Sequence, residues 1–242
     1  MTGECHQTRS KCYTKRMKYT SEYQPPTLTV DAVVFQIIDE KLQVLLVRRS
    51  QEPFKDQPAV PGGYNPQGET TNAALKRITL RKAGVDIDKD LKYIEQLYTF
   101  DTVARDPRGH AVSVSYMGCG RDVQPAKSAS ERPFFIPVDE LPELPYDHAD
   151  IILYARDRLR SKLTYTNAVY AFLPGKFTLT QLQHAYETIL GKELDKRNFR
   201  KKFLSLGLIK ETDEMFREGA HRPARLYEFT SKKLTSLSRS FD

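Results

Sequence analysis

The chain has 242 residues, enough for one large domain or two domains of ordinary size around a buried core. It lacks an apolar run near the ~18 residues of a membrane span and a hydrophobic N-terminal signal segment, so we expect a cytoplasmic protein without membrane association. Three cysteines without a C-x-x-C pair argue against a disulfide framework or a zinc site, and the net charge of +7 is compatible with an acidic partner.

The N-terminal part of the sequence predicts a basic arm followed by strands. Residues 1–24 hold five Lys and Arg against two acidic residues. β-Branched and apolar residues then fill Leu28–Ile38 and Leu42–Val47, with a polar turn between them, which predicts two strands. The same criterion predicts further strands at Leu91–Phe100 and His110–Met117.

Residues 62–85 contain the most informative motif. Two glycines, Gly62 and Gly63, follow a proline-rich loop, and we expect them to adopt backbone conformations that other residues avoid. The segment resembles the Nudix box, G-x5-E-x7-R-E-U-x-E-E-x-G-U with U an aliphatic residue. The positions that match in register are Gly63, Glu69, Arg77, Gly84 and Val85.

Three glutamates of the box are replaced by Ile78, Arg81 and Lys82. These positions are spaced i, i+3 and i+4, so they share the helix face that offers oxygen ligands to magnesium in an enzyme of this family. A divalent cation about 4 Å from one Arg or Lys would be repelled by roughly 8 kcal/mol at an effective dielectric constant of about 20. We therefore predict no catalytic residues, no bound metal and no enzymatic activity. The alternative is a metal site rebuilt from acids elsewhere, such as Asp101 or Asp106.

The resemblance extends over about residues 25–160, because Phe134–Leu144 is similar to the segment before the last Nudix helix. It implies a ligand cleft shaped by the positions Arg48, Gly62, Gly63, Glu69 and Arg77. Glu69 and Arg77 have a second interpretation, an ion pair that fixes the loop against the helix. Arg81 and Lys82 are suited to hold a diphosphate directly by charge-assisted hydrogen bonds, without a metal.

The C-terminal third of the chain is basic and helical. Residues 156–242 hold 18 Lys and Arg against 10 Asp and Glu, a net charge of +8. A short helix is predicted at Thr166–Leu173, before a Pro-Gly pair. A second helix is predicted to start at Thr178, the N-cap residue, which can form a capping box with Gln181. This helix ends at Gly191.

A third helix is predicted at Asp195–Leu206, with an apolar stripe on one side and basic residues on the other. A β-hairpin follows it, and this layout is typical of a winged helix-turn-helix that places its third helix in the DNA major groove. The residues expected to contact bases or phosphates are Lys196, Arg197, Asn198, Arg200, Lys201, Lys202, His221, Arg222 and Arg225.

A degenerate Nudix domain followed by a winged helix resembles the Nudix-related transcriptional regulators of bacterial NAD metabolism, the NrtR-like family. The resemblance implies an α+β protein: a Nudix-type α/β/α sandwich with a mixed sheet at residues 25–160 and a winged helix at residues 161–242. It also implies a homodimeric repressor that binds palindromic double-stranded DNA, with ADP-ribose or a related nucleotide as effector and no cofactor.

Three alternatives to this function remain open at the level of sequence. The first is an active ADP-ribose or nucleoside-diphosphate hydrolase with an unusual metal site. The second is a sugar-responsive regulator of the same architecture. The third is an RNA-binding or structural protein that uses the fold as a scaffold.

Overall fold

The computed structural model describes residues 24–217, 223–231 and 233–237, so all but the last residue of the basic arm predicted at residues 1–24, and the tip of the predicted hairpin, lie outside the described residues. The elements of the N-terminal part are β1 (Thr27–Ile38), β2 (Lys41–Arg48), β3 (Pro58–Ala59), β4 (Gly62–Tyr64), α1 (Thr71–Ile78), the π-helical turn η1 (Thr79–Ala83), α2 (Ile87–Asp90), β5 (Tyr93–Phe100), β6 (Ala111–Cys119), β7 (Arg132–Pro137), the 3-10 turn η2 (Val138–Glu140) and α3 (His148–Tyr165). None of the described helices combines the length and apolar character needed to cross a bilayer.

In the described part of the chain, seven strands form one mixed sheet in the order β3-β2-β1-β6-β5, with β4 beside β1 and β7 beside β2. The pairing of β1 with β6 is parallel, and the other pairings are antiparallel. The predicted strands and the mixed sheet are confirmed, with boundaries that differ by one or two residues.

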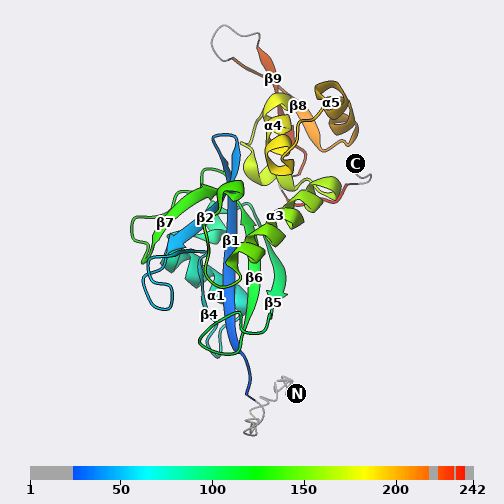
Figure 1. Ribbon diagram of the computed structural model, residues 1–242. Coiled ribbons are helices and arrows are strands. Elements are labelled where there is room, and N and C mark those ends of the chain that lie inside the picture. Colours follow the sequence, from blue (N-terminus) through cyan, green and yellow to red (C-terminus); the bar gives the residue numbers. More distant parts are fainter. Residues whose placement is uncertain (1–23, 218–222, 232, 238–242) are drawn as a thin grey trace, which may run out of the picture.

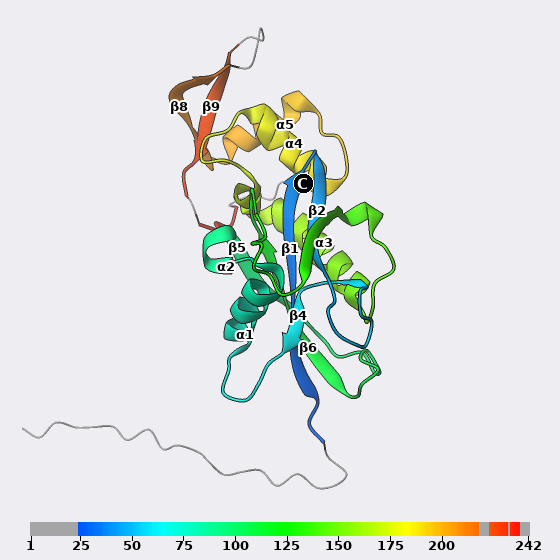
Figure 2. The same cartoon turned by 90° about the vertical axis from the view of Figure 1, so that its left-hand side faces the viewer.

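Side chains of the central strand β1 alternate between the two faces of the sheet, as the period of two requires. Val30, Ala32 and Val34 belong to the buried cluster that contains residues of α1. Val33 and Phe35 belong to the cluster that contains residues of α3. Figure 2 shows α1 and α3 on opposite sides of β1. The expected α/β/α sandwich is therefore present.

The C-terminal part contains the 3-10 helix η3 (Ala168–Phe172), α4 (Leu179–Leu190), α5 (Lys196–Ser205), β8 (Ile209–Phe216) and β9 (Ala224–Phe229). The predicted capping box of α4 is present: the Thr178 hydroxyl accepts from the Gln181 amide, and Gln181 accepts from the Thr178 amide. Gly191 ends α4 with a left-handed backbone at φ 68°. The apolar stripes of α4 and α5 are buried around Tyr186, Phe199 and Phe203. Helices α4 and α5 and the hairpin lie together at one end of the molecule (Figure 1).

Two details differ from the sequence prediction. The first helix of the winged helix is a short 3-10 helix, Ala168–Phe172, rather than a helix over Thr166–Leu173, because Thr166 is extended and Pro174 follows closely. Helix α3 also continues through position 160 to Tyr165, so the predicted division between residues 160 and 161 falls inside a helix. One continuous apolar cluster runs from β1 and α3 into α4 and α5.

Candidate ligand cleft and nucleic-acid interface

A cleft of about 380 Å³ lies beside β4 and the C-terminal end of the box helix, which is the helix that α1 and η1 form together. Its walls come from β1, the loop after β2, β4, the box helix, the loop after β5, the residues before β7 and the start of α3. Five of the seven positions that sequence reasoning selected line it: Gly62, Gly63, Arg77, Arg81 and Lys82. Segments far apart in the chain therefore meet at one site.

The other two selected positions, Arg48 and Glu69, are not part of the lining. The Arg48 guanidinium lies over the Phe134 ring, 5.4 Å from its centroid, and donates to the carbonyl of Asp56 at 3.3 Å. Its neighbour Arg49 lines the cleft instead, since consecutive side chains near a strand end point to opposite sides. Sequence reasoning missed Arg49 by one residue, and the side-chain alternation along β2 was the signal that could have found it.

Arg49 is held in the cleft by backbone carbonyls and by an aromatic ring. Its guanidinium donates to the carbonyl of Pro53 at 2.9 Å and to that of Gln51 at 3.3 Å. It also lies 5.3 Å from the centroid of the Tyr146 ring. Among the described residues it has no acidic partner within ion-pair distance.

Gly62 is required by close packing and not by its backbone angles. We expected Gly62 and Gly63 to adopt conformations that other residues avoid, but both are in strand β4 and neither has a positive φ. A Cβ atom at Gly62 would lie 1.9 Å from Oδ1 of Asp31, whereas a Cβ at Gly63 would lie 3.4 Å from the nearest atoms, in Ile78. The first glycine therefore provides space for a buried carboxylate.

Glu69 and Arg77 form the ion pair that was the second interpretation of these residues. Arg77 donates to both carboxylate oxygens, at 2.8 and 2.7 Å, and to the carbonyl of Tyr64 at 2.9 Å. The hydrogen bond from Arg77 lowers the pKa of Glu69. Arg77 thus ties the loop to the box helix while part of its surface lines the cleft.

The three residues that replace the box glutamates lie at the cleft but differ in environment. Ile78 is buried, with 3% of its surface exposed, and packs among the apolar residues between α1 and the sheet. Lys82 lies 3.2 Å from Oε1 of the buried Glu131. Arg81 is exposed and has no ion pair among the described residues. Among the residues that the structure describes, Arg81 and Arg49 are therefore two cleft cations without an acidic partner.

Three of the four acids that line the cleft, Asp31, Asp106 and Glu131, lie within ion-pair distance of a cation, while the exposed Glu52 has no ion pair among the described residues. The Asp106 carboxylate accepts from Arg108 at 2.9 and 2.6 Å, and this hydrogen bonding lowers the pKa of Asp106. Asp101 is exposed and is not part of the lining. The described residues contain no group of three or more His, Cys, Asp or Glu side chains placed to hold a metal ion. This donor set does not fit the magnesium site that the fold family implies.

A buried network at the cleft joins four parts of the chain that are far apart in sequence. Arg105 donates to both oxygens of Asp147, at 2.8 and 2.6 Å, and to Oδ2 of Asp31 at 3.3 Å. Ser113 donates to the same Asp31 oxygen at 2.6 Å. His148, the first residue of α3, accepts at Nδ1 from the Val60 amide, and burial lowers its pKa. No local pattern indicated this network, because Arg105 and Asp31 are 74 residues apart.

Two tyrosine rings lie at the same cleft with Arg108 beside both. The Arg108 guanidinium is 5.3 Å from the Tyr64 centroid and 5.9 Å from the Tyr146 centroid. Tyr64 is 53% exposed, so one of these aromatic surfaces is accessible. An exposed ring in a cleft that is also lined by Arg49 and Arg81 can accommodate a planar base next to phosphate groups.

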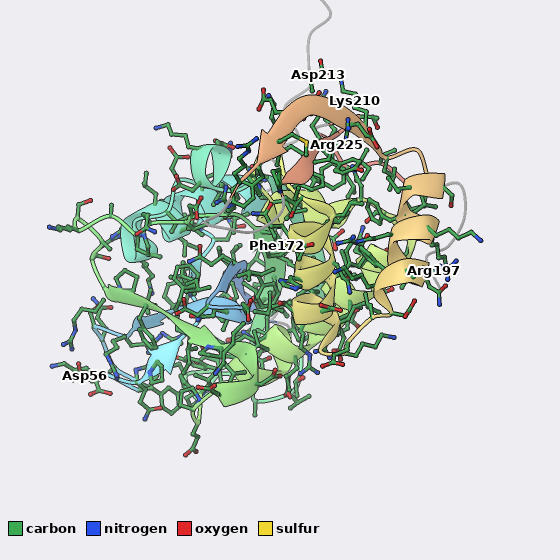
Figure 3. The ribbon with its side chains drawn as sticks, turned by 90° about the horizontal axis from the view of Figure 1, so that it is seen from above. Asp56, Phe172, Arg197, Lys210, Asp213 and Arg225 are labelled. Atoms are coloured by element: carbon green, nitrogen blue, oxygen red, sulfur yellow. The ribbon has the colours of Figure 1, made fainter. Side chains whose placement is uncertain are left out.

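The predicted nucleic-acid interface lies on α5. Lys196, Arg197, Asn198 and Lys201 are exposed. Figure 3 shows Arg197 on the outer side of α5. Arg200 is half-buried and donates to the Thr180 hydroxyl at 2.9 Å, so it also ties α5 to the start of α4. Lys202 is half-buried as well.

The described part of the hairpin carries paired charges. Arg225 lies 3.1 Å from Glu211, and Lys210 lies 2.9 Å from Glu228. Both cations are on the strands that Figure 3 shows beside α5. The predicted contacts His221 and Arg222 lie outside the described residues.

The chain is similar to known proteins over most of its length. A NUDIX domain model matches residues 27–156, and a model described as "NrtR DNA-binding winged helix domain" matches residues 169–229. The "ADPR responsive transcriptional repressor NtrR" of Acinetobacter baylyi is 36% identical over 215 residues, which cover 86% of this chain and 84% of the relative. The "ADP-ribose pyrophosphatase" of Methanocaldococcus jannaschii is 32% identical over 142 residues, or 58% of this chain and 77% of the relative.

Solved structures agree with this result. Shewanella oneidensis NrtR complexed with a 27mer DNA is similar with a TM-score of 0.73 at 31% identity, over 89% of this chain and 99% of that chain. A MutT/nudix family protein from Enterococcus faecalis is similar with a TM-score of 0.68 at 26% identity, over 88% and 90% of the two chains. The domain order, the match over most of both chains and the shared architecture lead to one conclusion. The chain belongs to the NrtR family of Nudix-related transcriptional regulators.

Proposed function

We propose that the protein is a DNA-binding transcriptional repressor whose Nudix-like domain binds ADP-ribose, or a closely related nucleotide, without hydrolysing it. The observation that carries the proposal is the charge of the cleft. Arg49 and Arg81 line it without an acidic partner among the described residues, whereas three of its four acids, Asp31, Asp106 and Glu131, lie within ion-pair distance of a cation. Because ADP-ribose is the part of NAD that remains after nicotinamide is removed, we propose that the regulated genes belong to NAD metabolism.

The chemistry of the cleft supports a nucleotide that contains a diphosphate group as the effector. The two unpaired guanidinium groups can each donate two hydrogen bonds to phosphate oxygens, and such charge-assisted bonds contribute about 1.5–3 kcal/mol each. The Tyr64 and Tyr146 rings offer surfaces for a base. The name of the Acinetobacter relative, which describes a response to ADPR, agrees with this assignment.

The absence of hydrolysis is part of the proposal and rests on the donor set. Lys82 occupies a position where the box has a glutamate, and its ammonium group lies beside Glu131. A divalent cation at this place would meet a fixed positive charge. Hydrolysis is the second candidate function, because the chain is similar to the ADP-ribose pyrophosphatase of Methanocaldococcus jannaschii.

Calorimetry of ADP-ribose binding to the full chain separates the two functions. We expect the same affinity with EDTA and with magnesium, and no release of AMP or ribose phosphate during incubation. Arg81→Ala should weaken binding by roughly tenfold or more, since it removes a charge-assisted contact. Arg132→Ala, an exposed arginine outside the cleft, is the matched control. A strict requirement for magnesium, or product formation, would favour the hydrolase.

DNA binding is proposed for the exposed face of α5, in a homodimer that reads a palindromic site. Helix α5 packs on α4 through Phe199 and Phe203 and leaves Lys196, Arg197 and Asn198 exposed. Two such helices in a dimer would enter successive major grooves about 34 Å apart. Selection of bound sequences from a random duplex pool tests this. Recovery of sequences without two-fold symmetry would argue against a dimeric reader, and preference for single-stranded RNA would favour the scaffold alternative.

Helix α3 supplies the physical link by which ligand binding is proposed to alter DNA binding. Tyr146 and His148, at its start, line the cleft, and Asp147 is held by Arg105. After its other end, Thr166 forms an isolated β-bridge with Ser236, and the backbone amide of Asn167 donates to the carbonyl of Thr235 at 3.1 Å. Both contacts are with the C-terminal segment. A ligand that favours one position of α3 therefore biases the placement of the winged helix.

A DNA gel-shift titration with and without ADP-ribose tests this coupling. We expect ADP-ribose to weaken operator binding by wild-type protein. Asp147→Asn should leave binding of DNA alone nearly unchanged and reduce the response to ADP-ribose. A variant response equal to that of wild type would show that α3 does not carry the signal through Asp147.

A further inference from the structure

A buried carboxylate oxygen in the cleft lacks a donor. Glu131 lies just before β7 and lines the cleft, and its side chain is only 5% exposed. Oxygen Oε1 is 3.2 Å from Lys82 and accepts from the Ser50 hydroxyl at 3.4 Å. Oxygen Oε2 is buried and accepts no hydrogen bond from the described residues. Buried polar atoms are ordinarily paired, so this oxygen calls for a donor from outside the protein.

The position of Glu131 is fixed by backbone contacts as well as by its side chain. The amide of Ser130 donates to the carbonyl of Arg81 at 2.8 Å, and the amide of Glu131 donates to that of Lys82 at 3.3 Å. The carboxylate is therefore anchored beside the end of the box helix, next to the two basic residues that replace glutamates. A carboxylate acceptor this close to Arg81 and Lys82 can distinguish the hydroxyl groups of a ligand from its phosphate groups.

We propose that Glu131 recognises a ribose hydroxyl of the effector. A carboxylate oxygen repels phosphate but accepts strongly from a hydroxyl group, whereas the unpaired guanidinium groups of Arg49 and Arg81 attract phosphate. The two kinds of group together fit a ligand that carries ribose hydroxyls close to a diphosphate. This inference rests on the proposed function, because it names the part of the nucleotide that Glu131 selects.

The donor can belong to either of two riboses in ADP-ribose: the ribose of adenosine or the terminal ribose. Both offer the same vicinal hydroxyl groups to a carboxylate. Two comparisons separate them. ADP lacks the terminal ribose, and 2′,3′-dideoxy-ADP also lacks the hydroxyls of the adenosine ribose.

The test is calorimetry of ADP-ribose, ADP and 2′,3′-dideoxy-ADP binding to wild-type protein and to Glu131→Gln, in the presence of EDTA. The quantity to compare is the ratio of dissociation constants between two ligands, because Glu131→Gln also frees Lys82 and can strengthen phosphate binding for all three. We expect one ratio to fall by about tenfold or more in the variant, as for loss of a hydrogen bond to a charged group. If the dissociation constant of ADP divided by that of ADP-ribose falls, Glu131 contacts the terminal ribose. If the dissociation constant of dideoxy-ADP divided by that of ADP falls, Glu131 contacts the adenosine ribose.

Two further variants guard against an effect of misfolding. Arg132→Ala lies outside the cleft, so both ratios should remain those of wild type. Glu131→Asp keeps the negative charge opposite Lys82 but withdraws it by one methylene group, so it should lose the same preference as Glu131→Gln. Thermal melting of each variant checks its folding.

The results that overturn the inference are distinct from those that overturn the proposed function. Unchanged ratios in both Glu131 variants, with tight binding of ADP-ribose by wild type, would reject the role of Glu131 alone. A ratio that changes only when magnesium replaces EDTA would assign Oε2 to a cation and reject the hydroxyl contact. Failure of wild-type protein to bind ADP-ribose would reject both the inference and the proposed function.

Discussion

The substitution Gly62→Ala tests whether the cleft is built around the buried Asp31 carboxylate. The added Cβ would lie 1.9 Å from Oδ1 of Asp31. A carbon and an oxygen in contact lie about 3.3 Å apart, so the carboxylate or strand β4 must move by about 1.4 Å. Asp31 has little room for this movement, since it is 4% exposed and accepts from Ser113 and Arg105 through Oδ2.

The expected cost follows from these contacts. Overpacking in a well-packed interior costs about 1–3 kcal/mol. Loss of a hydrogen bond to a charged group adds about 1.5 kcal/mol or more. We therefore expect Gly62→Ala to lower the free energy of unfolding by about 2.5–4.5 kcal/mol and to weaken ADP-ribose binding, because the displaced Arg105 and Gly62 both line the cleft.

Urea denaturation, monitored by circular dichroism, measures the change in unfolding free energy of Gly62→Ala. Calorimetry measures its affinity for ADP-ribose. Gly63→Ala is the matched control, since its Cβ would lie 3.4 Å from the nearest side-chain atoms and neither glycine has a positive φ. It should cost less than 1 kcal/mol in unfolding free energy. Equal stability of Gly62→Ala and wild type, or equal losses in the two variants, would refute the argument from close packing.

Three further outcomes are expected. Thr178→Ala should reduce the stability of the winged helix by about 1 kcal/mol in urea denaturation, while Thr178→Ser should retain most of it; equal melts would show that the cap is unimportant. Lys201→Ala should reduce the slope of log affinity for DNA against log salt by about one unit if it neutralises a phosphate, and Lys76→Ala should leave the slope unchanged. The hydrogen bond from Arg108 lowers the pKa of Asp106 from its ordinary 3.8, so its stabilisation is present above pH 3.8 and is lost as pH falls through the lowered value. Asp106→Asn should therefore cost about 1.5 kcal/mol at pH 7, and this difference should shrink in more acidic urea melts; a constant difference would contradict the assignment.

The local features of the fold could be predicted because they depend on residues close in sequence. The capping box joins Thr178 to Gln181, three positions away, and Gly191 ends the same helix through its own backbone freedom. Strands β1 and β2 and their turn follow from short-range alternation of apolar and polar residues. The replacement of box glutamates by Arg81 and Lys82 was also visible, since the motif has fixed spacing.

The partners of the cleft residues required the tertiary structure. The sequence indicated an arginine at the end of β2, but only the direction of the side chains places Arg49 in the cleft and Arg48 against Phe134. It suggested a glycine at position 62 for backbone freedom, whereas the folded chain requires it for contact with Asp31.

By itself the sequence determined the two-part architecture, the basic third helix of the winged helix and the loss of the metal-binding acids. Tertiary structure alone decided which charges remain unpaired in the cleft. Glu131 and Ser50 are 81 residues apart, and Arg105 and Asp31 are 74 apart. The reason is physical: an ion pair depends on distance in space, and long-range pairing across a sheet leaves no periodic pattern in the chain.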